Sequence, residues 1–199
     1  MITLNIPALL CTACVSGYWL TVFVKAMLIT SKIGKTPNVI PKEILGLLSR
    51  MVMLPLIACW IVLPWHATFY ITPLSHPIAW VGSFICVMAL ALTIYCWYYM
   101  GNSWRIGIDP KEKNTLITDG PFKHIRHPIY SLSMLLMLGS LLAVQTTSML
   151  VIFCVHWVLF TLEAYREERY LSKVHGAAYN EYVHQTNRFL PPCRRAGNA

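Results

Sequence analysis

The chain has 199 residues, of which 56% are hydrophobic and only 12% are charged. Soluble domains carry about 25% charged residues, so this composition could not cover a globule of this size with a solvated surface. It excludes a disordered chain, a disulfide-framed secreted module and an ordinary soluble enzyme. The formal net charge of +8 is less informative than the positions of the charges.

Three long stretches contain no Asp, Glu, Lys or Arg: residues 1–24, 51–104 and 127–162. A membrane-spanning helix needs about 20 predominantly apolar residues, and these stretches are long enough to supply several such helices. They predict an all-α, polytopic integral membrane protein that forms one domain over residues 1–199. The five expected transmembrane helices cover residues 4–24, 46–68, 78–100, 128–144 and 149–164.

Four of these spans carry further information. The first has no basic residue ahead of it and runs into a basic flank, which is not typical of a cleaved signal peptide. The last two spans are short and are separated only by a polar break at 145–148, so we expect a helical hairpin. Arg50 near the start of the second span could extend its side chain toward the membrane interface.

The basic residues predict the orientation in the membrane. All 16 Lys and Arg residues fall within 25–50, 105–126 and 166–195. Because cytoplasmic loops carry an excess of Lys and Arg, these blocks predict a cytoplasmic C-terminus and active-site loops, with the N-terminus outside. The positive charge then indicates topology and contact with anionic membrane lipids, and we expect no nucleic-acid partner.

Several familiar catalytic patterns are absent from the sequence: GxGxxG, the P-loop, HExxH and GxSxG. Cys11 and Cys14 have CxxC spacing, but they lie inside an apolar span without further ligands, so we expect no metal. No feature indicates an obligate protein partner. Any cofactor must therefore be held by a site built on the membrane scaffold, and the candidate catalytic region is 101–192.

The connection between the third and fourth spans is long and retains aromatic residues, so we expect an ordered binding loop. It ends in Arg126-His127-Pro128. Proline is favoured at the first position of a helix, so this tripeptide could simply begin the fourth span. Alternatively, the free amides near Ile129 and Tyr130, with Arg126 and His127 as further donors, could receive an anionic group.

Two further segments follow the fifth span. Glu163 and Glu167 are like charges at i,i+4, which is mildly unfavourable on an exposed helix. They could belong to a solvated helix, or they could bind a cation or a ribose diol. Gly176 is expected to end this helix. A short amphipathic helix with Tyr179 and Tyr182 would follow, lying on the membrane surface or packing over the site.

Taken in this order, the segments resemble the isoprenylcysteine carboxyl methyltransferase and phospholipid methyltransferase superfamily. The resemblance covers roughly residues 101–192, from a Trp-bearing loop to an R-x-x-P motif. The matching residues are Gly120, Phe122, Arg126, His127, Pro128, Tyr130, Glu167, Glu168, Gly176, Tyr179, Tyr182, Arg188 and Pro191. The resemblance implies methyl transfer from S-adenosylmethionine to a lipophilic small molecule or lipid-linked acceptor within the membrane.

The resemblance also implies roles for individual residues. The cofactor-binding residues would be Asn114, Thr115, Leu116, Ile117, Phe122, His127, Pro128, Ile129, Tyr130 and Glu167. The catalytic residues would be Glu167, His127 and Arg126, and the substrate would contact Trp104, Glu163 and Arg166. His127 and the helix start would hold the methionine carboxylate, Glu167 a cationic or hydroxylated group, and the apolar side chains the adenine.

One position departs from the prenylcysteine branch, in which a substrate-binding arginine lies four residues before the cofactor glutamate. Glu163 occupies this position here, which favours a neutral, thiol or amine acceptor, such as an aminophospholipid, over a carboxylate unless Arg166 substitutes. Two other interpretations stay open. Membrane sterol or enone reductases, which use NADPH, share a related C-terminal pattern but are usually longer. A non-enzymatic transporter or assembly protein would explain the spans but not the ordered motifs.

Overall fold

A computed structural model describes residues 4–34, 44–104 and 115–192 of the chain. The α-helices in these ranges are α1 (Ile6–Ile33), α2 (Ile44–Tyr70), α3 (His76–Met100), α4 (Pro128–Val144), α5 (Thr147–His175) and α6 (Ala177–Gln185). Two short 3₁₀ helices, η1 (Gly101–Ser103) and η2 (Gly120–Lys123), lie between α3 and α4. The described residues form no β-strand, so the predicted all-α class is confirmed.

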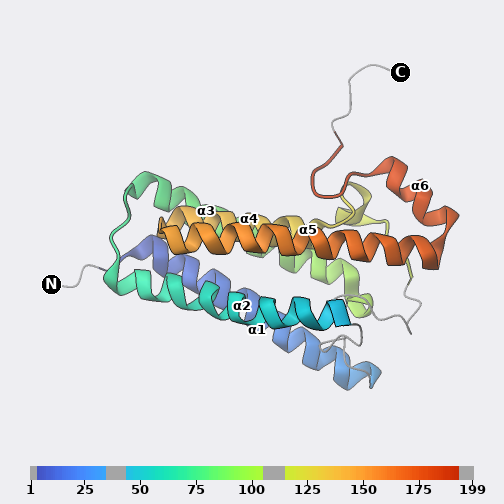
Figure 1. Cartoon of the computed structure of the whole chain (residues 1–199), viewed down its shortest axis with the longest axis horizontal. Coiled ribbons are helices and arrows are strands. Elements are labelled where there is room, and N and C mark those ends of the chain that lie inside the picture. Colours follow the sequence, from blue (N-terminus) through green and yellow to red (C-terminus); the bar gives the residue numbers. More distant parts are fainter. Residues whose placement is uncertain (1–3, 35–43, 105–114, 193–199) are drawn as a thin grey trace, which may run out of the picture.

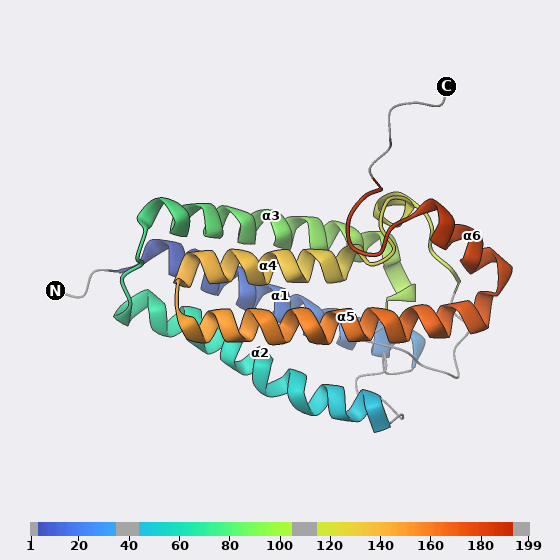
Figure 2. The ribbon, with the colours of Figure 1, turned by 45° about the horizontal axis from the view of Figure 1, so that its top comes forward.

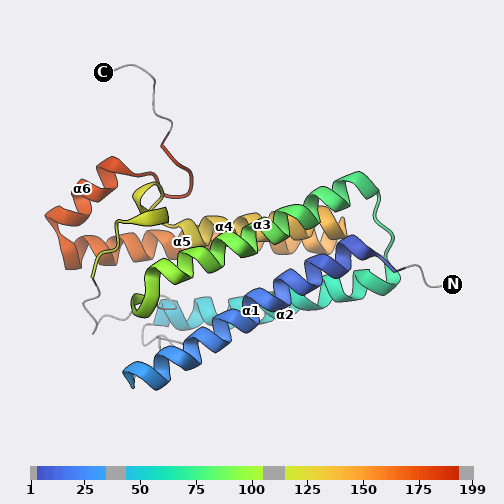
Figure 3. The ribbon, with the colours of Figure 1, turned by 180° about the vertical axis from the view of Figure 1, so that it is seen from behind.

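The first five helices run lengthwise in one bundle (Figure 1). In Figure 2, α4 lies between α3 and α5, which makes it the central helix. The connections α2–α3 and α4–α5 lie at the end of the bundle where α1 begins, whereas η2 and α6 lie at the opposite end (Figures 1 and 3). The segments that resembled methyltransferase motifs therefore gather at one end of the bundle.

The length and composition of the helices match a membrane protein. In the described ranges, α1, α2, α3 and α5 are each long and apolar enough to cross a bilayer. Helix α4 has 17 residues, which is close to the lower limit of about 17 residues for a span. Large apolar side chains such as Phe23, Phe84 and Val158 are exposed on the outside of the bundle. Hydrocarbon would solvate this surface, which water would not.

Two helices extend beyond their predicted spans. Helix α1 continues to Ile33 and α5 continues to His175, past the predicted ends at 24 and 164. The prediction ended each span where charged residues begin, but a helix need not end where it leaves the membrane. Helix α5 ends at Gly176, whose positive φ of 53° is a backbone conformation that glycine adopts readily.

The predicted polar break between α4 and α5 is shorter than expected. Gln145 adopts a left-handed conformation with φ of 54° and ends α4. The Thr146 side chain accepts a hydrogen bond from the Met149 N–H, so α5 already begins at Thr147. The two helices form the expected helical hairpin through this tight connection.

Glycines bring α3 and α4 into close contact. A Cβ atom on Gly82 would lie 2.5 Å from the Ala143 nitrogen and 2.6 Å from the Gly139 oxygen. A Cβ atom on Gly139 would lie 2.7 Å from the Gly82 oxygen, so the contact is reciprocal. Small residues allow membrane helices to approach in this way. The close approach fixes the position of α4, whose first residues belong to the candidate site.

Candidate active site

The segment that precedes α4 pairs with the segment that follows α6. The Arg126 N–H donates to the Asn187 carbonyl at 2.9 Å. The His127 N–H donates to the Arg188 carbonyl at 3.1 Å. These backbone hydrogen bonds join two motifs that are 61 residues apart in the sequence. The predicted R-H-P and R-x-x-P motifs are thus part of one structural unit.

The carboxylate of Glu168 is the centre of this unit. Its Oε1 accepts hydrogen bonds from the Nε atoms of Arg126 and Arg188, each at 3.0 Å. Its Oε2 accepts a further hydrogen bond from Arg188 Nη2 at 2.6 Å. Arg126 also donates to the carbonyls of Val183 and Thr186. Because Arg126 and Glu168 have side chains only 9% and 14% exposed, little water screens this ion pair.

The hydrogen bonds that Arg188 donates to Glu168 hold the pKa of Arg188 above its usual range. The charge of this guanidinium is therefore stabilised by the folded structure. We call Arg126, Glu168 and Arg188 the arginine–glutamate cluster. From the sequence we predicted a role in cofactor binding and catalysis for Glu167 and no role for Glu168. The two arginines of the motifs nevertheless required an acidic partner. That unmatched pair of arginines was the signal that could have identified Glu168.

His127 lies against this cluster and is buried, with its side chain 5% exposed. Its Nε2 is 3.3 Å from Glu168 Oε1, and its Nδ1 is 3.7 Å from Glu167 Oε2. Despite the short first distance, Nε2 makes no well-aligned hydrogen bond with the described residues. The imidazole stacks on the Tyr130 ring, with 5.3 Å between centroids and 3° between planes.

Tyr130 contacts both polar and apolar neighbours: Glu167 on one side and Phe160 on the other. Its hydroxyl interacts with the Glu167 carboxylate. Its ring packs edge-on against Phe160, with 5.1 Å between centroids. Glu167 keeps 34% of its side chain exposed, against 14% for Glu168, so it is the more accessible of the two neighbouring acids.

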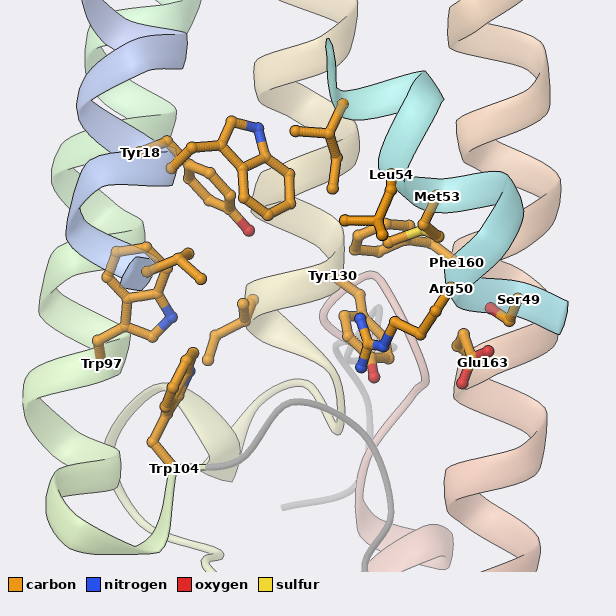
Figure 4. A pocket seen from close by; sticks show the side chains of 14 residues that line it. Tyr18, Ser49, Arg50, Met53, Leu54, Trp97, Trp104, Tyr130, Phe160 and Glu163 are labelled. Atoms are coloured by element: carbon orange, nitrogen blue, oxygen red, sulfur yellow. The ribbon is translucent and has the colours of Figure 1, made fainter. Parts of the chain in front are cut away.

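A cavity of about 210 Å³ lies among α1, α2, α4 and α5, with the end of α3 beside it (Figure 4). Its aromatic walls come from Tyr18, Trp19, Trp97, Trp104, Tyr130 and Phe160. The charged residues that line it are Arg50 and Glu163. Tyr130 belongs to this wall, so the cavity and the groups around His127 share one side chain.

The cavity brings together several predicted residues. Trp104 and Glu163, both predicted to bind substrate, line it, and so do Ile129 and Tyr130. The third predicted substrate residue, Arg166, lies beside it and donates to Glu163 Oε1 at 2.7 Å. The contributions of α1 and α2, including Arg50, were not predicted, because no motif in the first half of the chain indicated a site.

The other predicted cofactor residues lie in or near the connection before α4. Asn114 is outside the described residues, and Thr115, Leu116 and Ile117 lie at the start of the next described segment, with the latter two half-buried. Phe122 in η2 is buried. Pro128 occupies the first turn of α4, as predicted, and the His127 side chain makes no capping hydrogen bond there.

Tyr182 and Gly120 hold this connection in place. The Tyr182 hydroxyl donates to the Phe122 carbonyl at 2.6 Å, and burial raises the pKa of Tyr182 to about 12, so it remains a donor. Gly120 has φ of 56°, and a Cβ atom there would overlap the Tyr99 ring. The motif glycine is therefore required both by its backbone conformation and by the close approach of Tyr99.

The fold and the site define a polytopic membrane protein in which an aromatic intramembrane cavity shares a wall with a buried cluster of charged groups. Residues 80–173 match the model of the isoprenylcysteine carboxyl methyltransferase (ICMT) family. The fold is similar to that of the eukaryotic intramembrane Ras methyltransferase ICMT, solved without a monobody, with a TM-score of 0.63. The match has 14% sequence identity and covers 93% of this chain and 67% of that chain. No curated protein matched the sequence.

At this identity the structural match shows the fold alone. The family match is a match in sequence, and it covers the region that contains most of the predicted site. The resemblance to the isoprenylcysteine carboxyl methyltransferase superfamily is thereby confirmed. The chain is a multi-pass membrane protein with an ICMT-like fold, and the family whose model it matches is one of methyltransferases.

Proposed function

We propose that this protein transfers the methyl group of S-adenosylmethionine to a lipophilic acceptor in the intramembrane cavity. The position of Tyr130 carries the proposal. Its ring lines the cavity, while its hydroxyl interacts with Glu167 and its face stacks on His127. An acceptor in the cavity and a cofactor beside His127 and Glu167 would therefore lie on either side of Tyr130. The match to a methyltransferase family supports the same reaction.

The polar groups fit the chemistry of S-adenosylmethionine. The buried His127 Nε2 lacks a hydrogen bond within the described part of the chain. With the first amides of α4, it would hold a carboxylate, because free N–H groups at a helix start attract anions. Glu167 would bind the ammonium or the ribose hydroxyls of the same molecule. Bound there, S-adenosylmethionine would supply an electrophilic methyl group on its sulfonium.

The protein residues would orient the acceptor, exclude water and accept a proton. The aromatic cavity would exclude water and orient the acceptor. The arginine–glutamate cluster would hold the segment that carries His127, so we assign Arg126 a positioning role through Glu168. An amine or thiol acceptor must lose a proton, and Glu167, which interacts with the wall residue Tyr130, would accept it.

We further propose that the site faces the cytoplasm. The end of α1, the start of α2 and the charged end of α5 all lie at the end of the bundle that carries α6 (Figure 3). Under the positive-inside rule, the basic residues at that end, such as Lys32, Arg50 and Lys173, would be cytoplasmic. The N-terminus would then lie outside, and a soluble cofactor would reach the site from the cytoplasm.

The cofactor assignment predicts the behaviour of Glu167→Gln. S-adenosylmethionine or its demethylated product should raise the unfolding temperature of the detergent-purified protein, because a ligand of the folded state stabilises it. Glu167→Gln should weaken this binding by about tenfold or more, since a hydrogen bond to a charged group is lost. A titration followed by thermal unfolding measures the effect. Glu181→Gln, an exposed position on α6, is the matched control and should bind normally.

Three results would contradict this assignment. Stabilisation by NADPH alone would indicate a reductase instead. No stabilisation by either compound would favour a non-enzymatic membrane protein. Normal cofactor affinity in Glu167→Gln would remove the role given to that carboxylate.

A further inference from the structure

The indole N–H of Trp97 is a buried donor without a partner. Trp97 lies in the last turn of α3 and is 3% exposed. Within the described part of the chain, its Nε1 makes no hydrogen bond. In Figure 4 the nitrogen lies on the side of the ring that faces the cavity. A buried donor left unpaired costs free energy, so such donors normally meet an acceptor.

The surrounding contacts hold this indole in its orientation. Its ring packs against Tyr18, with 5.2 Å between centroids, and edge-on against Trp104, with 6.4 Å between centroids. The Lys25 ammonium donates to the Trp97 carbonyl at 2.8 Å, which ties the end of α3 to α1. These contacts hold the indole ring and the end of α3 in place. The indole N–H therefore remains directed toward the cavity.

A second indole repeats the pattern on the neighbouring helix. Trp19 of α1 also lines the cavity, and its buried Nε1 likewise finds no hydrogen-bond partner among the described residues. Two indoles with unpaired N–H groups thus belong to a cavity wall that is otherwise mainly apolar and aromatic, and the N–H of Trp97 faces the cavity. A ligand without an oxygen or nitrogen acceptor in its apolar body would leave the Trp97 donor unpaired.

The opposite side of the cavity has a different character. Arg50, Tyr130 and Glu163 lie together there, across the cavity from Trp97 (Figure 4). Arg50 interacts electrostatically with both Tyr130 and Glu163. Charged side chains within membrane helices commonly mark functional sites. The reacting group of a ligand would therefore lie near Tyr130, and a separate polar atom of the same ligand would lie near Trp97.

We infer that the ligand of this cavity is an oxygenated lipophile, with a carbonyl, ether or hydroxyl oxygen within its apolar body that accepts a hydrogen bond from Trp97. An unsubstituted hydrocarbon chain does not fit the unpaired indole donor of Trp97. The inference rests on the proposed function only for the name of the ligand, which would be the methyl acceptor. Its test therefore measures binding without the cofactor.

The test compares two kinds of probe of equal length. One is a linear alkane thiol, and the other is the same thiol with one mid-chain methylene replaced by an ether oxygen. A series of ether thiols varies the position of the oxygen. At its best position, the ether thiol should bind the wild-type protein about tenfold more tightly than the alkane thiol, since a buried donor gains its acceptor. Trp97→Phe keeps an aromatic ring but removes the N–H, and it should abolish this preference. Trp157→Phe, an exposed position on α5, should retain it.

Equal binding of both probes by the wild-type protein at every oxygen position would overturn the inference, and so would an unchanged preference in Trp97→Phe. If that variant does not fold, the indole ¹⁵N–H resonances of the wild-type protein provide the second measurement. One of them should move with the ether thiol and not with the alkane thiol, and a spectrum without such a change would also overturn it. A preference for the ether thiol without any cofactor binding would instead contradict only the proposed methyl transfer.

Discussion

Replacing Glu168 with glutamine is expected to lower the free energy of unfolding by about 3 kcal/mol, because two arginines would lose their shared carboxylate in a mostly buried place. The neutral amide could accept only part of the hydrogen bonds that Arg126 and Arg188 now make. The segment before α4 would then be held to the segment after α6 mainly by backbone hydrogen bonds. Thermal and denaturant unfolding of the purified protein without cofactor would measure the loss.

Glu167→Gln is the matched control for this experiment. The two acids are neighbours in the sequence, but the Glu167 side chain is 34% exposed and that of Glu168 is 14% exposed. Exposed charged groups contribute about 0–1 kcal/mol, so the stability of Glu167→Gln should be nearly unchanged. Glu167 should thus affect cofactor binding, and Glu168 should affect stability first. Equal stability of the two variants would contradict the central position of Glu168.

The second large effect is expected for Gly82→Ala. The added Cβ atom would lie 2.5 Å from the Ala143 nitrogen, 2.6 Å from the Gly139 oxygen and 2.8 Å from the Leu142 carbonyl carbon. All three are backbone atoms, so no side chain can rotate away and α3 must separate from α4. Overpacking typically costs 1–3 kcal/mol, and we expect about 3 kcal/mol or more here. The unfolding temperature in detergent would measure this loss.

Gly17→Ala separates this packing effect from the ordinary effect of replacing glycine in a helix. A Cβ atom on Gly17 would lie 3.7 Å from Leu90 Cδ2, which is a normal van der Waals distance. Because alanine favours helix by about 1 kcal/mol over glycine, Gly17→Ala should be neutral or stabilising. If Gly82→Ala were equally well tolerated, the close approach of α3 and α4 would not be needed for stability.

Gly82→Ala should also weaken cofactor binding, although Gly82 is not part of the site. Helix α4 carries Pro128 and Tyr130 in its first turn, and the close contact with α3 fixes the position of this helix. A displaced α4 would move the Tyr130 ring relative to the cavity. Binding should therefore fall together with stability, as measured by the cofactor titration described above.

The membrane class and most limits of the helices in the described residues followed from the sequence alone, because the thickness of a bilayer determines how many apolar residues a span needs. The predicted ends of α1 and α5 were too early, since hydropathy reports the membrane boundary and not the end of the helix. The cap at Gly176 and the helix start at Pro128 were predicted correctly, because both depend on local backbone conformation.

The sequence motifs also indicated which parts of the chain meet, but not which side chains face each other. Consecutive residues in a helix point about 100° apart, so only one of Glu167 and Glu168 can face the arginines. Only the tertiary structure decided that this residue is Glu168. It also decided that Arg50 and Trp97 face a common cavity, because their meeting depends on how α2 and α3 pack and rotate within the bundle.

The amino-acid sequence by itself determined the membrane fold and the methyltransferase-like motifs through local length, composition and spacing. The shape and polarity of the cavity arise from contacts between distant residues, which no local pattern contains.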